Sequence, residues 1–134
     1  MTKQTGADSY LPEFKIKNAV IESARITGED HNLLDVWLTL NYGGSGQDFG
    51  GWALYLPKSF THHKGAPHYA GHFIWRVMEV AGVLRWDQVV GKTIRASASH
   101  SKVDGIGHII KDDWFFPSKD FEQLKADLKT LDPT

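Results

Sequence analysis

The side chains in this sequence that could recognise a ligand are its flat aromatic rings and its arginines. An aromatic plane stacks on a nucleobase and an arginine fork donates paired hydrogen bonds to phosphate, so together they suit a small anionic nucleotide. The chain has five tryptophans and seven phenylalanines, and its arginines are Arg25, Arg76, Arg85 and Arg95. Most of the rings must be buried, because a domain of this size needs their apolar area in its core.

Trp75 is the ring that we expect to be exposed. It lies next to Arg76 and outside the helical apolar stripe that includes Phe73 and Val77. An exposed tryptophan on a helix indicates a partner, either a ligand or another subunit. The predicted ligand contacts are stacking by Phe73 or Trp75, phosphate or ribose binding by Arg25, Arg76 and Arg95, and hydrogen bonding to polar edges by Asn41 and His108.

The glycine-rich segment at residues 42–52, YGGSGQDFGGW, predicts a turn between two strands. A phosphate-binding loop would end in Lys-Ser or Lys-Thr, and the dinucleotide fingerprint would open a helix and have its third glycine where this chain has Phe49. Gly50 and Gly51 fall inside the second strand. They indicate either a bulge or a lowered sheet surface that a flat ligand or a second chain can approach.

Histidine and carboxylate patterns give little support for an enzyme or a metal site. His68 and His72 are spaced i and i+4, as metal ligands on a helix can be, but no HExxH motif or suitably spaced carboxylate accompanies them. The G-x-S-x-G turn of serine hydrolases is absent. A small hydrolase that uses His31, Asp112 or Asp113 is the weaker alternative. We expect no catalysis, no metal and no cofactor.

Composition points to one globular domain. The chain has 134 residues, of which 41% are apolar and 23% charged, and both fractions are ordinary for a folded protein. We predict a flexible N-terminal arm at residues 1–12 and a single α+β domain at residues 13–131. The net charge of -1 argues against binding to duplex nucleic acid, and the lack of cysteine excludes disulfides and thiol chemistry. No apolar run approaches the ~18 residues of a membrane span, so we expect a cytoplasmic protein.

The elements that must position these side chains follow two periodicities. Alternating patterns at residues 14–26, 34–42 and 47–56 predict three strands, the second of which places Asp35 on a wet face. Helical spacing at residues 68–83 predicts a helix that packs its apolar stripe on the sheet and ends near a glycine.

The second half of the chain predicts a shorter set of elements. A helical turn at residues 86–91 precedes a hairpin around Asp104 and Gly105, and a last helix begins at Pro117 with Ser118 as its N-cap. The order β-β-β-α-β-β-α gives an α+β fold, with an antiparallel sheet of about five strands and two helices over one face. The other face is expected to be polar or covered by a second subunit.

Four motifs together resemble a family of small bacteriophage and prophage proteins: NYGGSGQDFGGWAL, FIWRVMEVAGV, W-D-x-V-x-G-K and IGHIIKDDWFFP. This family is similar to the Thoeris anti-defence proteins, which bind cyclic ADP-ribose signals made by TIR-domain defence enzymes. Some members also bind cyclic di- and trinucleotides. The resemblance implies a cyclic-nucleotide sponge that sequesters its ligand without cleaving it, in pockets between subunits of a homo-oligomer in the host cytoplasm.

A different class of function is the main alternative to nucleotide binding. A phage protein could inhibit a host protein directly, through an exposed aromatic and glycine-rich surface. The two hypotheses differ in the partner that they predict, which is a small molecule in one case and a stoichiometric protein in the other.

Overall fold

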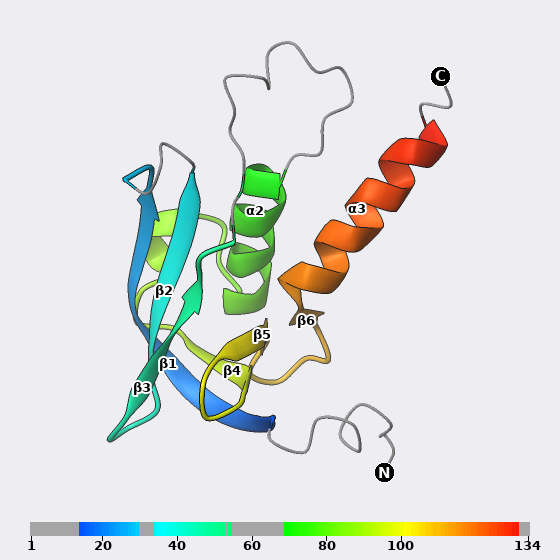
Figure 1. Cartoon of the computed structure of the whole chain (residues 1–134). Helices are drawn as coiled ribbons and strands as arrows, with labels where there is room; N and C mark the ends of the chain where they lie inside the picture. Colours follow the sequence, from blue (N-terminus) through cyan, green and yellow to red (C-terminus); the bar gives the residue numbers. More distant parts are fainter. Residues whose placement is uncertain (1–13, 30–33, 53, 55–68, 132–134) are drawn as a thin grey trace.

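Six antiparallel strands form one open sheet in the order β3-β2-β1-β4-β5-β6 (Figure 1). The computed structural model describes residues 14–29, 34–52, 54 and 69–131. The elements are β1 (Lys15–Thr27), β2 (Asp35–Asn41), β3 (Gly46–Gly50), α2 (Tyr69–Ala81), a 3-10 turn (Trp86–Gln88), β4 (Thr93–Ala98), β5 (Val103–Gly107), β6 (Trp114–Phe115) and α3 (Pro117–Leu131). The predicted α+β class and antiparallel sheet are confirmed, and β6 is a strand beyond the predicted five.

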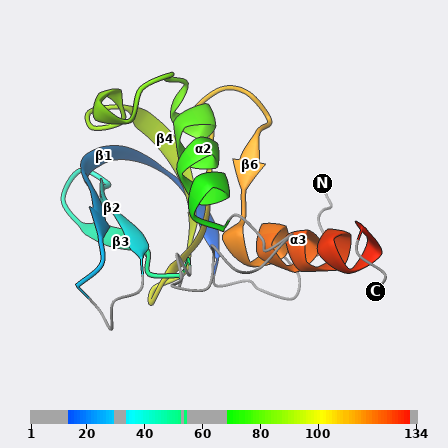
Figure 2. The same cartoon turned by 90° about the horizontal axis from the view of Figure 1, so that it is seen from above.

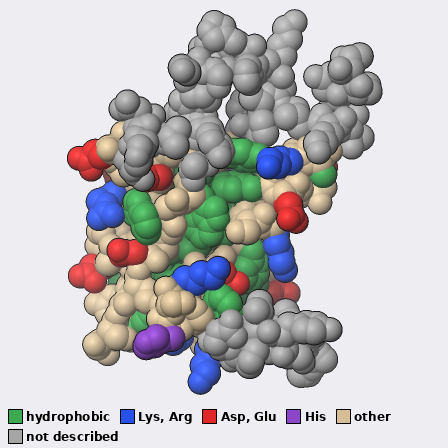
Figure 3. Space-filling view, viewed as in Figure 1, with side chains coloured by type: hydrophobic (Ala, Val, Ile, Leu, Met, Phe, Trp, Pro, Cys, Tyr) green, Lys and Arg blue, Asp and Glu red, His purple; other side chains and the backbone are tan. Residues whose placement is uncertain are grey.

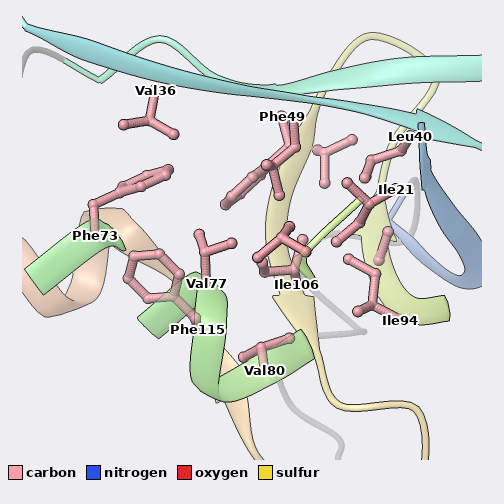
Figure 4. Close-up of a cluster of buried hydrophobic side chains, with 14 of the residues drawn as sticks. Ile21, Val36, Leu40, Phe49, Phe73, Val77, Val80, Ile94, Ile106 and Phe115 are labelled. Carbon is pink, nitrogen blue, oxygen red and sulfur yellow. The ribbon is translucent and has the colours of Figure 1, made fainter. Parts of the chain in front are cut away.

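The sheet curves around α2, which lies in its hollow, whereas α3 runs out to one side (Figures 1 and 2). Figure 4 shows the core between the sheet and α2, where side chains from the strands point toward the buried face of the helix. The buried core residues labelled there are Ile21, Val36, Leu40, Phe49, Phe73, Val77, Val80, Ile94, Ile106 and Phe115. One apolar layer therefore joins all six strands to α2.

The predicted end of α2 is confirmed at Gly82. Its φ of 77° is in the left-handed region that favours glycine. The Gly82 amide donates to the Glu79 carbonyl at 3.1 Å, and the Val83 amide donates to the Met78 carbonyl at 3.0 Å. These two bonds form a Schellman cap, so the chain leaves α2 in a fixed direction.

The turn between β4 and β5 runs from Ser99 to Lys102, so the predicted turn at Asp104 and Gly105 is wrong. The Ser99 hydroxyl accepts hydrogen bonds from the amides of Ser101 and Lys102, each at 3.2 Å. The Ser99 amide donates to the Lys102 carbonyl at 2.8 Å. These side-chain bonds favour an earlier turn, and Asp104 and Gly105 become part of β5.

The N-cap of α3 also differs from the prediction. The Phe116 carbonyl accepts the amides of Lys119 and Asp120, both at 3.0 Å, so Phe116 is the N-cap. Pro117 is then the first helical residue, where its fixed φ and missing N–H fit well. Ser118 lies inside the first turn and does not cap the helix.

Asp35 is 8% exposed, so its predicted position on a wet face is wrong. The chain beyond β3 continues beside the start of β2, where the Leu54 amide donates to the Leu34 carbonyl at 3.0 Å. That contact helps to enclose this end of β2. Strand β3 ends at Gly50, and residues 53 and 55–56 of the predicted strand lie outside the described residues.

Several expectations concern parts of the chain that the structure does not describe. They are the arm at residues 1–12 and the side chains of His31 and His68. Within the described ranges, no helix is long and apolar enough to cross a membrane.

Candidate functional site

The space next to Gly50 and Gly51, at the end of β3, is occupied by other parts of the same chain. A β-carbon built on Gly51 would lie 2.6 Å from Cζ2 of Trp37, and the φ of Gly51 is 85°. At Gly50, with a φ of 143°, a β-carbon would overlap the Val36 carbonyl oxygen. Gly50 is thus required by the backbone of β2, and Gly51 is required by the Trp37 ring.

A second ring lies on a glycine at the other end of the sheet. Trp114 is the cross-strand partner of Gly107, and a β-carbon on Gly107 would lie 2.5 Å from the indole. Across β5, Arg95 is also paired with Gly107, and its guanidinium lies 4.9 Å from the Trp114 ring centroid. The glycine lets the ring and the cation meet above the strand.

The Phe116 ring lies over Gly105 in the same way, two residues before Gly107 in β5. A β-carbon on Gly105 would overlap its ring, and the ring lies beside Trp114 with centroids 5.8 Å apart and planes 18° apart. The Lys119 ammonium lies 5.3 Å from the centroid of Phe116. Arg95, Trp114, Phe116 and Lys119 therefore form a continuous row, and its two rings cover the glycines of β5.

Arg76 fixes the loop that leads into β6. Its guanidinium donates to the Asp113 carboxylate at 2.8 Å and to the Trp114 carbonyl at 2.9 Å, and it also pairs with Glu79 at 2.5 Å. The hydrogen bond from Arg76 lowers the pKa of the Asp113 carboxyl below its ordinary value. The predicted phosphate ligand Arg76 is thus already engaged with carboxylates of its own chain.

His108 and Arg95 hold the same loop from the sheet side. The His108 Nδ1 accepts the amides of Ile110 at 3.0 Å and Lys111 at 2.9 Å, and the His108 amide donates to the Asp113 carbonyl at 2.9 Å. Arg95 donates to the carbonyls of His108 at 2.7 Å and Lys111 at 2.8 Å. Three of the predicted ligand residues, Arg76, Arg95 and His108, therefore lie close together. Their described contacts hold the loop between β5 and β6 in place.

The other predicted ligand residues do not join them. Phe73 is 0% exposed, so its predicted stacking on a base is wrong: the core needs its ring against Phe49 and Phe115. Arg25 is exposed on β1 opposite Trp37 of β2, and β4 and β5 lie between β1 and β6.

The remaining two predicted residues are exposed, but each lies in a different place. The Asn41 Oδ1 accepts the amide of Gly43 at 2.7 Å and so shapes the β2–β3 turn. Trp75 is 56% exposed on α2, as the sequence predicts. The seven predicted side chains therefore do not form one site.

A pocket of about 450 Å³ lies at the end of the sheet where β1 and β5 begin and β4 and β6 end. We call it the turn pocket. Its lining residues are Phe14, Ser99, His100, Ser101, Lys102, Asp104, Phe116, Ser118 and Lys119. The antiparallel order β1-β4-β5-β6 is what brings these distant segments together.

The turn pocket combines cations, hydroxyls and rings. Lys102 and Lys119 provide two ammonium groups against the single carboxylate of Asp104, and His100 is a further nitrogen donor or acceptor. One oxygen of Asp104, Oδ1, is buried without a hydrogen-bond partner in the described part of the chain. The composition favours an anion that also carries hydrogen-bond donors, and the phenyl ring of Phe116 adds a flat apolar wall.

A smaller hollow of about 240 Å³ lies at the C-terminal end of α2. We call it the α2-end hollow. It is lined by Trp75, Met78, Glu79, Gly82, Val83 and Leu84. On the face seen in Figure 3, hydrophobic side chains gather near the middle, and charged side chains lie both among them and at the edges. Most of the lining of this hollow is apolar, unlike the lining of the turn pocket.

The histidines and carboxylates that the structure describes do not gather into a metal site. No cluster of three or more histidines and carboxylates that could hold a metal is present there. His72 Nε2 pairs with the Asp120 carboxylate at 2.7 Å and so links α2 to α3. Of the residues considered for a hydrolase, Asp113 is bound by Arg76, and Asp112 is exposed in the loop.

Comparison with protein-family models, curated proteins and solved structures gives no match for this chain. The resemblance to phage anti-defence proteins therefore stays a prediction from the quoted motifs.

Proposed function

We propose that this protein binds and sequesters a small anionic nucleotide without cleaving it, and that its turn pocket holds the ligand. The carrying observation is the lining of that pocket, in which Lys102, Lys119 and His100 lie around hydroxyls and the ring of Phe116. Its volume of about 450 Å³ is in the range of small-molecule sites. Ammonium groups bind phosphate, and a flat ring stacks on a base.

Asp104 and the serines match the rest of such a ligand. A carboxylate accepts hydrogen bonds from ribose hydroxyls or from an amino group of a base, and serine hydroxyls donate to phosphate oxygens. The pocket also lies beside the N-terminal end of α3, where the helix dipole favours negative charge. The same pocket would suit a simple inorganic anion less well, because its aromatic and carboxylate walls would have no partner.

Sequestration is favoured over hydrolysis by the surroundings of the pocket. Ser99 is the most buried serine of the lining, and its hydroxyl is engaged by the turn that it shapes. A nucleophile needs an adjacent base that takes its proton, and the hydrogen bonds of Ser99 go to Ser101 and to the backbone of Lys102. The finer identity, a cyclic ADP-ribose isomer or a cyclic oligonucleotide, rests on the family resemblance.

Calorimetry with cyclic ADP-ribose isomers, cyclic dinucleotides and AMP tests the proposal. We expect the double variant Lys102→Ala/Lys119→Ala to raise the dissociation constant by at least about tenfold, because each lysine provides a charge-assisted contact. The matched control is Lys92→Ala/Lys125→Ala, which removes two exposed lysines that do not line the pocket. Absence of heat with every ligand would remove the proposal.

Recovery of the ligand separates sequestration from turnover. A saturated sample is heated until the protein denatures, and the released nucleotide is analysed by chromatography. Intact ligand after long incubation is the expected result, whereas an opened ring or a hydrolysed phosphodiester would make the protein an enzyme.

A further inference from the structure

The face of the sheet that points away from α2 has its own set of side chains. Ile94, Ile106 and Phe115 belong to the buried core (Figure 4), so the residues before and after each of them in its strand point the other way. The same alternation holds on β1 around the buried Ala19. We call the resulting surface the outer face, and its residues are Ile16, Asn18, Val20, Thr93, Arg95, Ser97, Gly105, Gly107, Trp114 and Phe116.

Two rings form a flat platform on the outer face. Trp114 and Phe116 are half-buried, and each ring lies directly over a glycine of β5, Gly107 and Gly105 respectively. Their centroids are 5.8 Å apart and their planes differ by 18°, so the two rings lie side by side above one strand. One face of each ring is on the strand and the other is turned outward. Aromatic side chains placed in this way on a sheet bind successive bases of a single strand, one base over each ring.

A cation lies at each end of this platform. The Arg95 guanidinium is 4.9 Å from the Trp114 ring centroid, and the Lys119 ammonium is 5.3 Å from the Phe116 ring centroid. Arg95 donates to two main-chain carbonyls, which leave its positive charge in place and the faces of its guanidinium plane open to stacking. Neither cation forms an ion pair within the described part of the chain, so both can contact phosphate.

The outer face has no aspartate or glutamate among its residues. Three carboxylates lie close to β5 and β6 in the sequence: Asp113 is bound by Arg76, Asp112 directly follows the exposed Lys111, and Asp104 lines the turn pocket. A partner of this face therefore meets cations and flat rings, which favours a polyanion with accessible bases. A duplex is a poorer fit, because its bases are stacked inside and the rings cannot reach them.

We infer that the outer face binds single-stranded nucleic acid, with two successive bases on the platform and phosphates beside Arg95 and Lys119. This activity goes beyond the proposed function. Phe116 and Lys119 also line the turn pocket, but Arg95 and Trp114 do not, so the two sites can be altered separately.

Fluorescence anisotropy with labelled oligothymidylate and oligouridylate of about ten nucleotides tests the inference. We expect both single strands to bind, and a blunt duplex of the same length to bind at least about tenfold more weakly. The logarithm of the association constant should fall with the logarithm of the salt concentration with a slope of about -1.4, because two cations neutralise two phosphates of a single strand.

Asn18→Glu is the informative charge variant, because Asn18 is exposed on β1 and is the cross-strand partner of Arg95. The new carboxylate would neutralise the guanidinium and repel phosphate, and we expect the dissociation constant for both single strands to rise at least about fivefold. The matched control is Gln88→Glu, which adds the same charge at an exposed position of the 3-10 turn, outside the outer face. Circular dichroism verifies that each variant is folded.

Two variants of Trp114 separate base stacking from simple apolar contact. Trp114→Leu keeps an apolar side chain over Gly107 but removes the ring, so the dissociation constant is expected to rise at least about fivefold. Trp114→Phe keeps a ring and should retain most of the binding. Equal affinities of the two variants would contradict a stacking platform.

The absence of any anisotropy change up to about 100 μM protein, the weak end of nucleic-acid binding, would overturn the inference and leave the outer face to a protein partner. Equal binding of the duplex, or equal losses in Asn18→Glu and Gln88→Glu, would overturn it too. Calorimetry separates the two proposals, because Asn18→Glu should bind a small nucleotide in the turn pocket as the wild type does. Small-nucleotide binding without oligonucleotide binding would be a failure of this inference alone.

Discussion

Two tryptophans flank the same ion pair and have opposite surroundings. Trp114 follows Asp113, lies on Gly107 and is covered by the Arg95 guanidinium. Trp75 precedes Arg76 and is 56% exposed, and none of the described glycines lies beneath it. The ion pair between Arg76 and Asp113 thus lies between a ring that packs on its own sheet and a ring that is largely exposed.

Glycines in the strands of this protein, and Gly51 just after β3, lie where another part of the chain comes close. Gly51, Gly105 and Gly107 each lie under a ring from the same chain. Gly46 and Gly50 of β3 instead lie against backbone atoms of β2, so all five glycines make room for other parts of the same chain.

The largest expected effect comes from filling the space under Trp114. In Gly107→Ala the new methyl group meets the indole at about 2.5 Å, and overpacking of this kind costs about 1–3 kcal/mol of unfolding free energy. Chemical denaturation measures the loss. Gly71→Ala is the control, because the space around Gly71 on α2 is open and alanine favours a helix by about 0.5–1 kcal/mol.

A double-mutant cycle identifies the ring as the cause. In a Trp114→Ala background the clash is gone, so Gly107→Ala is expected to become neutral or slightly stabilising, since alanine restricts the unfolded chain more than glycine does. An equal cost in both backgrounds would mean that the Gly107 backbone, and not Trp114, requires glycine.

A smaller effect is expected from the ion pair itself. The Arg76 guanidinium lowers the pKa of Asp113, so the pair stabilises the fold above the carboxyl's ordinary pKa and loses this contribution as pH falls through the lowered value. Asp113 is 40% exposed, which limits the contribution to about 1 kcal/mol or less.

Asp113→Asn measures that contribution directly. The stability difference from wild type is expected at neutral pH. It should vanish once the pH is below the lowered pKa of Asp113 in the folded protein, where the carboxyl is protonated in both the folded and the unfolded chain. Asp87→Asn is the control, since the Arg85–Asp87 pair is two-thirds exposed on both sides and should contribute less. A difference that persists at low pH would assign the effect of Asp113→Asn to packing.

The parts of the fold that could be predicted from sequence depend on local patterns. The alternation in β2, the apolar stripe of α2 and the glycine at its end each depend on residues within a few positions of one another. The β4–β5 turn was misplaced because two signals compete there, and hydrogen bonds of the Ser99 side chain prevail over the Asp104-Gly105 pair.

The candidate site was less predictable because it depends on strand order. Phe14, Lys102 and Lys119 are far apart in the chain and meet only because β1, β4, β5 and β6 are neighbours in the sheet. The predicted ligand set had the appropriate residue types, but its arginines are occupied by loop carbonyls and carboxylates. The sequence shows which rings and cations the chain contains. Tertiary contacts determine which of them are free to bind a ligand.

The smallest effect is expected at the exposed tryptophan. Trp75→Ala removes a ring that has no hydrogen bond or ring contact among the described residues, so the monomer's unfolding free energy should change by no more than about 0.5 kcal/mol. The measurement is denaturation at a concentration low enough to keep the protein monomeric. Trp114→Ala, on the other side of the ion pair, should cost clearly more under the same conditions, because its ring packs on Gly107 and Phe116. Equal losses from the two variants would mean that Trp75 stabilises its own chain and is not reserved for a partner.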